Sequence, residues 1–138
     1  MRRTAIRFSF VVLAALAIMA VFANAQAPDF SKVQIKTNKI SNNFYTLDGQ
    51  GGTIGVLAGP DGVFMVDGQF APLTDKIVAA IKQITNAPIK YMVNTHVHGD
   101  HTGGNENFGK LGVTILARGS LRNRLMHPAP AEIGRAHV

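Results

Sequence analysis

The sequence contains no cysteine among its 138 residues. A chain without cysteine forms no disulfide, offers no thiolate to a metal or a substrate, and cannot be anchored through a lipidated cysteine. It also lacks a phosphate-binding P-loop, a dinucleotide-binding glycine pattern and a Gly-x-Ser-x-Gly elbow. Internal repeats and low-complexity segments are absent as well. Any chemistry must therefore come from other side chains.

Acidic residues are scarce, with eight Asp and Glu against 14 Lys and Arg. Part of this excess lies in the two end segments described below. Removing Arg2, Arg3, Arg7, Glu132 and Arg135 leaves ten basic and seven acidic residues, a net charge of +3. A charge of this size is ordinary for a globular domain and does not indicate a nucleic-acid-binding surface. We therefore expect no nucleic-acid partner.

The one long apolar run, residues 8–22, follows the basic start Met1 to Arg7. Small residues at Ala23-Asn24-Ala25 and Ala25-Gln26-Ala27 have the spacing that signal peptidase needs. The run is shorter than the ~20 residues of a spanning helix. We interpret residues 1–25 as a secretory signal peptide, with cleavage at 27 as the alternative. The mature protein is then expected to be periplasmic or secreted, without a membrane anchor.

The last seven residues, 132–138, match the translation of a common short-read sequencing adapter. We interpret them as non-native, and we expect a longer genomic reading frame. His137 is then not a candidate ligand. Residues 26–131 are expected to form the N-terminal part of one domain.

The pattern of apolar residues predicts an α/β fold. Val33 and Ile35 alternate with polar residues as in an edge strand, and short strands are expected at 44–47, 53–58, 63–66 and 113–116. An amphipathic helix begins near Pro72 and ends before Pro88, and residues 89–93 read as a buried strand. A strand, a helix and a second strand joined by short links indicate a right-handed parallel βαβ unit.

A dense group of ligand-type side chains, His96-Val97-His98-Gly99-Asp100-His101, follows that buried strand. His96 and His98 are two residues apart, so an extended backbone directs both side chains to one side. Gly99 is expected to turn the chain through positive φ, which would bring Asp100 and His101 to a neighbouring position. Imidazole and carboxylate are ligands suited to zinc, and also to iron or manganese. The pattern predicts a metal site.

This His-x-His-x-Asp-His string, with Thr102-Gly103-Gly104-Asn105 behind it, resembles the signature of the metallo-β-lactamase superfamily. The likeness runs from Asn43 through Asp67 to about Met126. It implies the first half of an αββα four-layer sandwich, truncated, in which His96 and His98 bind one metal and Asp100 and His101 the second. Asp100 is also the residue to which we assign a catalytic role. The family's remaining ligands are a further histidine, a bridging aspartate and a last histidine. They lie further downstream and have no counterpart in this chain, so the resemblance implies that the longer reading frame contains them.

The ligands predict the reaction. Two metals about 3.5–4 Å apart can share a hydroxide and polarise a carbonyl oxygen. We expect an exported metal-dependent hydrolase with two Zn²⁺ in the intact protein. Its small-molecule substrate would carry a carbonyl-type bond such as a β-lactam, lactone or thioester. The truncated chain itself is expected to be inactive. The alternatives are an iron-dependent oxidoreductase on the same ligands and a non-catalytic metal-binding fragment, and the oligomeric state is left open.

Two further features have two interpretations each, and a third has one. Asp67 ends a strand, where it either orients a ligand histidine through its ring N–H or makes a turn. The Gly51-Gly52 and Gly103-Gly104 pairs either allow a close backbone approach or serve as turns. Asn105 and Ser120 are expected to cap the short helices that follow them.

Overall fold

The fold is known from a computed structural model that describes residues 28–128. The expected signal peptide and the suspected adapter tail lie outside these residues. The helices and strands follow one another in this order: η1 (Phe30–Lys32), β1 (Lys36–Lys39), β2 (Phe44–Asp48), β3 (Thr53–Gly59), β4 (Gly62–Val66), η2 (Ala71–Leu73), α2 (Thr74–Ile84), β5 (Ile89–Val93), α3 (Gly99–Thr102), α4 (Asn105–Lys110), β6 (Thr114–Leu116) and α5 (Gly119–Met126).

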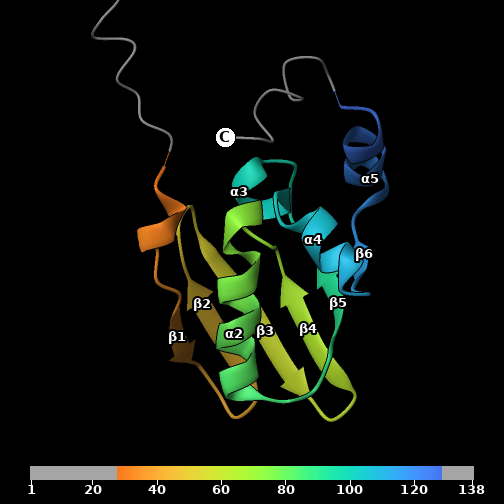
Figure 1. Cartoon of the computed structure of the whole chain (residues 1–138). Helices are drawn as coiled ribbons and strands as arrows, with labels where there is room; N and C mark the ends of the chain where they lie inside the picture. The colour runs from red at the N-terminus through yellow and green to blue at the C-terminus, as the bar shows by residue number, and fades with distance from the viewer. Residues whose placement is uncertain (1–27, 129–138) are drawn as a thin grey trace, which may run out of the picture.

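The strands form a single sheet in the order β1-β2-β3-β4-β5-β6 (Figure 1). Neighbouring strands from β1 to β4 are antiparallel, whereas β4, β5 and β6 are parallel. Helix α2 connects β4 to β5. The predicted βαβ unit is therefore confirmed, and the fold is of the α/β class with a mixed sheet.

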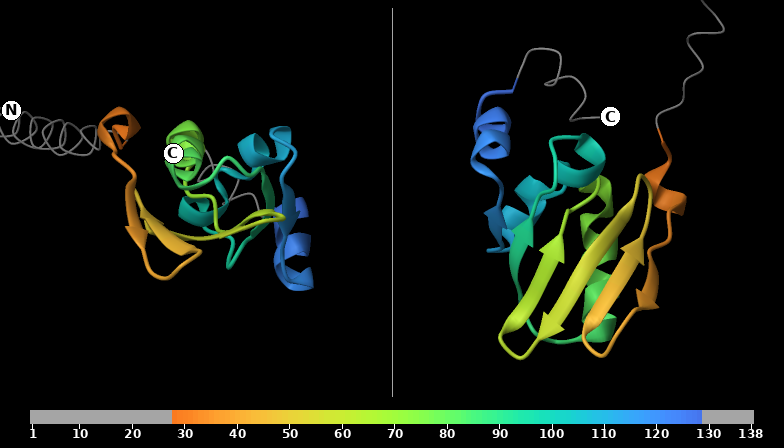
Figure 2. Two further views of the ribbon diagram at one scale, coloured as in Figure 1. Left: turned by 90° about the horizontal axis from the view of Figure 1, so that it is seen from below. Right: turned by 180° about the vertical axis from the view of Figure 1, so that it is seen from behind.

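The core lies between this sheet and α2. Leu73, Ile77 and Ile81 recur at helical spacing along η2 and α2 and are fully buried, as the amphipathic pattern predicts. From the sheet, alternate residues such as Met65 and Met92 point into the same layer. Phe108 of α4 is also fully buried, and α4 lies on the same side of the sheet as α2 (Figure 2).

The opposite face of the sheet is different. Seen from behind, no helix crosses β2, β3 and β4 within the part of the chain that the structure describes (Figure 2). Leu57, Tyr91 and Leu116 on this face are 42%, 46% and 43% exposed. The register places Leu57 beside Phe64 and Phe64 beside Tyr91, so apolar side chains form a row across three strands.

Some local predictions are wrong. The edge strand begins at Lys36 rather than at Val33, and Val33 and Ile35 instead pack against the core before the strand starts. The expected caps are not made, because α4 begins at Asn105 itself and Ser120 lies inside α5. Between residues 28 and 128 there is no helix with the length and hydropathy needed to cross a membrane.

Candidate metal centre

The four predicted ligands lie beyond the carboxyl ends of β4 and β5. Parallel strands bring these ends to the same edge of the sheet, where open α/β sheets usually place ligands. The chain leaving β5 carries His96 and His98 and then forms α3, which contains Asp100 and His101 and lies above this edge (Figure 1). Asp67 follows β4 directly, so two segments that are far apart in the sequence meet here.

Asp67 is the buried anchor of this edge, with only 4% of its surface exposed. Its Oδ1 accepts a hydrogen bond from the backbone N–H of Thr95 at 2.8 Å. Its Oδ2 accepts one from the Thr95 hydroxyl at 2.7 Å and one from Nδ1 of His101 at 2.8 Å. Of the two interpretations of Asp67, the structure supports the one in which it orients a histidine.

The imidazole rings form one cluster. The His96 and His98 rings meet edge to face with centroids 4.8 Å apart, and the His96 and His101 centroids are 3.9 Å apart. Nε2 of His101 is 3.4 Å from Oδ2 of Asp100. These contacts bring all four predicted ligand residues together.

The donors match a divalent metal in type but not in number. Nδ1 of His101 faces the Asp67 carboxylate, so its Nε2 remains for a metal beside the Asp100 carboxylate. Among residues 28–128, however, no three His, Asp or Glu side chains are arranged to hold one ion. Catalytic zinc sites ordinarily use three protein ligands and a water. The described residues thus supply donor types that suit a divalent metal, but no group of three ligands around one position.

The turn between the two ligand pairs is not made as expected. The φ of Gly99 is not positive. His98 has an extended backbone, with a φ of −64° and a ψ of 147°, and the four-residue helix α3 begins at the next residue, Gly99. The change of direction comes from the start of a helix at Gly99. The prediction that Gly99 turns the chain through positive φ is therefore wrong.

The glycines after α3 allow a close backbone approach. A Cβ on Gly103 would lie 2.5 Å from the Gly99 carbonyl oxygen, and one on Gly104 would lie 2.5 Å from that of Gly68. The N–H of Gly68 donates to the His101 carbonyl at 2.8 Å, and the N–H of Gly104 donates to the Gln69 carbonyl at 2.8 Å. Helix α3 is thus bound through its backbone to the segment that carries Asp67.

The loop between β2 and β3 also reaches the cluster. Gly51 has a φ of +91°, and a Cβ there would lie 2.8 Å from Cβ of Asp100 and 2.9 Å from Phe70. Gln69, buried to 1% exposure, holds this loop by donating from Nε2 to the Gly52 carbonyl at 2.7 Å. In this pair Gly51 serves the close approach, whereas a Cβ on Gly52 would lie 3.9 Å from the nearest atom, Cε1 of His101.

Two supporting residues were missed by sequence reasoning. Thr95 and Gln69 both fix the loops around the cluster, but a threonine beside a histidine and a glutamine in a loop are ordinary features. Asn105 was predicted to cap a helix, but its Nδ2 instead donates to Asn94 Oδ1 at 2.8 Å. Only the position of Thr95, at the end of a strand and next to His96, could have drawn attention to it.

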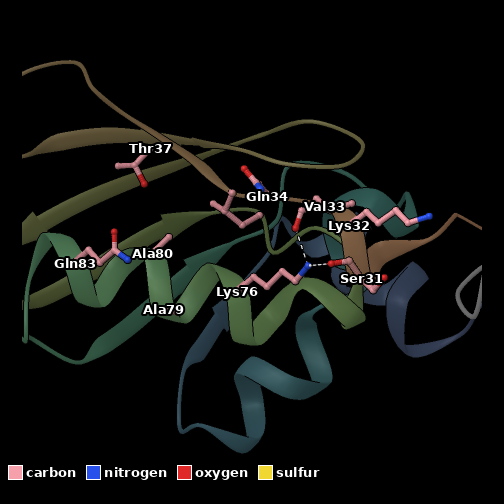
Figure 3. A pocket seen from close by; sticks show the side chains of 10 residues that line it. Ser31, Lys32, Val33, Gln34, Thr37, Lys76, Ala79, Ala80 and Gln83 are labelled. Carbon is pink, nitrogen blue, oxygen red and sulfur yellow. Dashed lines mark hydrogen bonds between the residues drawn. The ribbon is translucent and has the colours of Figure 1, made fainter.

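A pocket of about 650 Å³ lies elsewhere, between residues 31–37 and α2 (Figure 3). None of the four predicted ligands lines it. Nζ of Lys76 lies there and donates to three backbone carbonyls, those of Phe30, Ser31 and Val33, at 2.9, 2.7 and 2.6 Å. These bonds satisfy the ammonium group, so Lys76 fastens η1 to α2.

Comparisons with known proteins agree with this geometry. The family model described as the metallo-beta-lactamase superfamily matches residues 47–138. The solved metallo-beta-lactamase SMB-1, bound to 2-mercaptoethanesulfonate, is 29% identical over 71% of this chain and 39% of its own, with a TM-score of 0.61. FIM-1 from Pseudomonas aeruginosa in the mono-zinc form is 20% identical over 67% of this chain and 45% of its own, with a TM-score of 0.60.

A metallo-beta-lactamase from Cronobacter sakazakii with a HARLDQ motif is 19% identical over 67% of this chain and 37% of its own, with a TM-score of 0.61. At this identity, as for FIM-1, the likeness shows the fold alone. The chain spans between 34% and 47% of the length of such structures. No curated protein matches the sequence.

Proposed function

The chain belongs to the metallo-beta-lactamase superfamily. On this premise we propose that its residues 96–101 are the metal-binding loop of an exported, metal-dependent hydrolase. One observation carries the proposal: the bond between Asp67 Oδ2 and His101 Nδ1, which leaves Nε2 of His101 beside Asp100. A buried carboxylate on the far nitrogen of a histidine is the usual support of a metal ligand, because it fixes the tautomer and raises the basicity of the ring.

In the proposed site, His96 and His98 bind one ion and Asp100 and His101 the second. A bound zinc would supply Lewis acidity, which activates water and polarises a carbonyl oxygen of the substrate. The protein's own contribution is to hold the rings: Asp67 orients His101, and the backbone bonds of Gly68 and Gly104 fix α3. Asp100, next to His101 Nε2, is the carboxylate that would face the reacting water.

We propose a small molecule with a carbonyl-type bond, such as a β-lactam, lactone or thioester, as the substrate class. The 29% identity to the metallo-beta-lactamase SMB-1 supports this choice. We also propose that residues 1–25 direct export and are then removed.

A second candidate, metal binding without catalysis, applies to the 138-residue chain on its own. Between residues 28 and 128 no three ligand side chains are arranged around one position, and each proposed ion has only two protein ligands. A two-ligand site holds zinc weakly. We therefore propose that this chain alone binds zinc without hydrolysing substrate.

Zinc titration of the full chain tests the proposal. Competition with a chromogenic chelator should show binding that His96→Ala and His101→Ala each weaken by at least about tenfold, since each removes a ligand. His127→Ala is the matched control, because His127 is exposed and its Nδ1 lies 3.1 Å from its own helix's Asn123 carbonyl. Full zinc affinity in both cluster variants would contradict the ligand assignment.

Two further measurements separate the alternatives. Metal analysis of the purified protein should find zinc, whereas retained iron would favour the oxidoreductase. Hydrolysis of a chromogenic β-lactam, a lactone and a thioester by the chain alone should not exceed the uncatalysed rate. A chelator-sensitive rate above it would overturn the proposal that this chain is inactive.

A further inference from the structure

The hydroxyl of Thr95 lies between the buried carboxylate and the first histidine of the cluster. Thr95 Oγ1 is 2.7 Å from Asp67 Oδ2 and 3.0 Å from His96 Nδ1. Asp67 in turn contacts His101 Nδ1 through the same Oδ2. One carboxylate is thus connected to two of the three imidazoles, directly to one and through a hydroxyl to the other.

The positions of the hydrogens follow from the number of donors. An ionised carboxylate only accepts hydrogen bonds, and a hydroxyl has a single proton to donate. The short contact to Asp67 is charge-assisted and takes that proton. The Thr95 oxygen can then only accept from His96, so Nδ1 of His96 must carry a hydrogen. His101 is in the same position, because its Nδ1 faces the carboxylate itself.

We propose that Thr95 is a positioning residue: its hydroxyl fixes the Nδ1–H tautomer and the ring orientation of His96, and so leaves Nε2 as the nitrogen that binds metal. This inference rests on the proposed function for the role of His96 as a ligand. Within the described residues no hydrogen bond fixes the ring of His98, so the Thr95 contact is what distinguishes the two histidines.

The surroundings of Thr95 make this role specific. Its backbone N–H also donates to Asp67 Oδ1, so the residue is held by the carboxylate at two points and the hydroxyl has a defined direction. Replacing the hydroxyl by a methyl group keeps the backbone bond and the branched shape. Thr95→Val therefore removes the link to His96 with little other change.

The direct test is the tautomer of His96 in the metal-free full chain labelled with ¹⁵N-histidine, at about pH 8, where free imidazole is neutral. NMR should show Nδ1 protonated and Nε2 unprotonated for both His96 and His101. In Thr95→Val the His96 signals should move to a mixture of tautomers while those of His101 stay. Thr95→Ser, which keeps the hydroxyl, should restore the pattern of the original chain.

The second test is zinc affinity. Loss of a residue that supports a metal ligand typically costs about 10- to 100-fold in affinity, and we expect Thr95→Val to fall in this range and Thr95→Ser to recover within a few-fold. Thr102→Val is the matched control. It removes a hydroxyl of the neighbouring helix α3 that bonds only to the backbone carbonyls of Val97 and His98, and it should leave the affinity and both tautomers unchanged.

Two results would overturn the inference. One is a wild-type His96 with the proton on Nε2, which needs no variant to observe. The other is a Thr95→Val chain with unchanged His96 tautomer and zinc affinity. If the wild-type chain bound no zinc, the proposed function would fail, but the tautomers of the metal-free chain would still decide the role of Thr95.

Discussion

At the scale of single residues, Gly51 brings the β2–β3 loop against Asp100, one of the four proposed ligands. Two independent features require glycine there. Its φ is +91°, and a Cβ at this position would lie only 2.8 Å from the Cβ of Asp100. The glycine therefore sets both the shape of its own loop and the position of a proposed ligand on another.

We predict that Gly51→Ala destabilises the protein by about 1–3 kcal/mol through backbone strain and overpacking, and that it weakens zinc binding by displacing Asp100. Chemical denaturation and chelator competition measure the two effects. Gly112→Ala is the control for strain alone, because Gly112 has a φ of +83° and nothing within 4 Å of its Cβ position. Equal losses of zinc affinity in the two variants would show that the contact with Asp100 has no effect.

At the scale of elements, strands β2 to β6 and the long helix are those that the sequence predicts, whereas the edge strand β1 begins later than expected. Strands β2 to β5 are short apolar segments and helix α2 has apolar residues at a period of 3.6, and these signals are local because each lies within five to 11 consecutive residues. Helix α3 has only four residues and is held by bonds from Gly68 and Gln69, some thirty positions away, so no local pattern indicated it. Asn105 failed as a cap for the same reason, because its partner is Asn94 on another segment.

The same division holds for the candidate site. The ligand types and their order were visible in the sequence, because they lie in six consecutive positions. The orientation of a ligand histidine by Asp67 was one of two interpretations of the sequence, but the choice of His101 and the bonds to Thr95 depend on how β4 and β5 pair.

The bonds between α2 and η1 allow a prediction at this scale. Lys76→Met removes three hydrogen bonds from a charged donor, and we expect a loss of about 1–3 kcal/mol in the free energy of unfolding. Hydrogen exchange should rise in residues 30–35 more than in the sheet. Lys82→Met is the control, because Lys82 is an exposed lysine of the same helix. If exchange in residues 30–35 rose no more in Lys76→Met than in Lys82→Met, the fastening role would be wrong.

At the scale of the whole molecule, the two faces of the sheet are unequal. One face is covered by α2 and α4, and the other exposes large apolar side chains in the described part of the chain. Contiguous apolar patches of this kind promote association, and exposed strands add to the effect. The chain also spans less than half the length of the solved structures that share its fold.

We predict that the chain self-associates through this face. Sedimentation at increasing concentration should show large species, and Leu57→Thr with Tyr91→Thr should shift the distribution toward monomer, because both changes keep strand propensity and remove apolar area. Leu111→Thr is the control, since Leu111 is 58% exposed but lies outside the sheet. A monomer that unfolds in one cooperative transition, without either substitution, would refute the prediction.

The bond between Asp67 and His101 joins residues 34 positions apart, and this fixes when in folding the cluster can form. Closing a loop of that length costs about 3 kcal/mol of chain entropy, which a single hydrogen bond does not recover. The His101 ring can therefore be oriented by Asp67 only after β4, α2 and β5 have packed. During synthesis the histidines emerge with their spacing already present, but their geometry is acquired only at the end of folding.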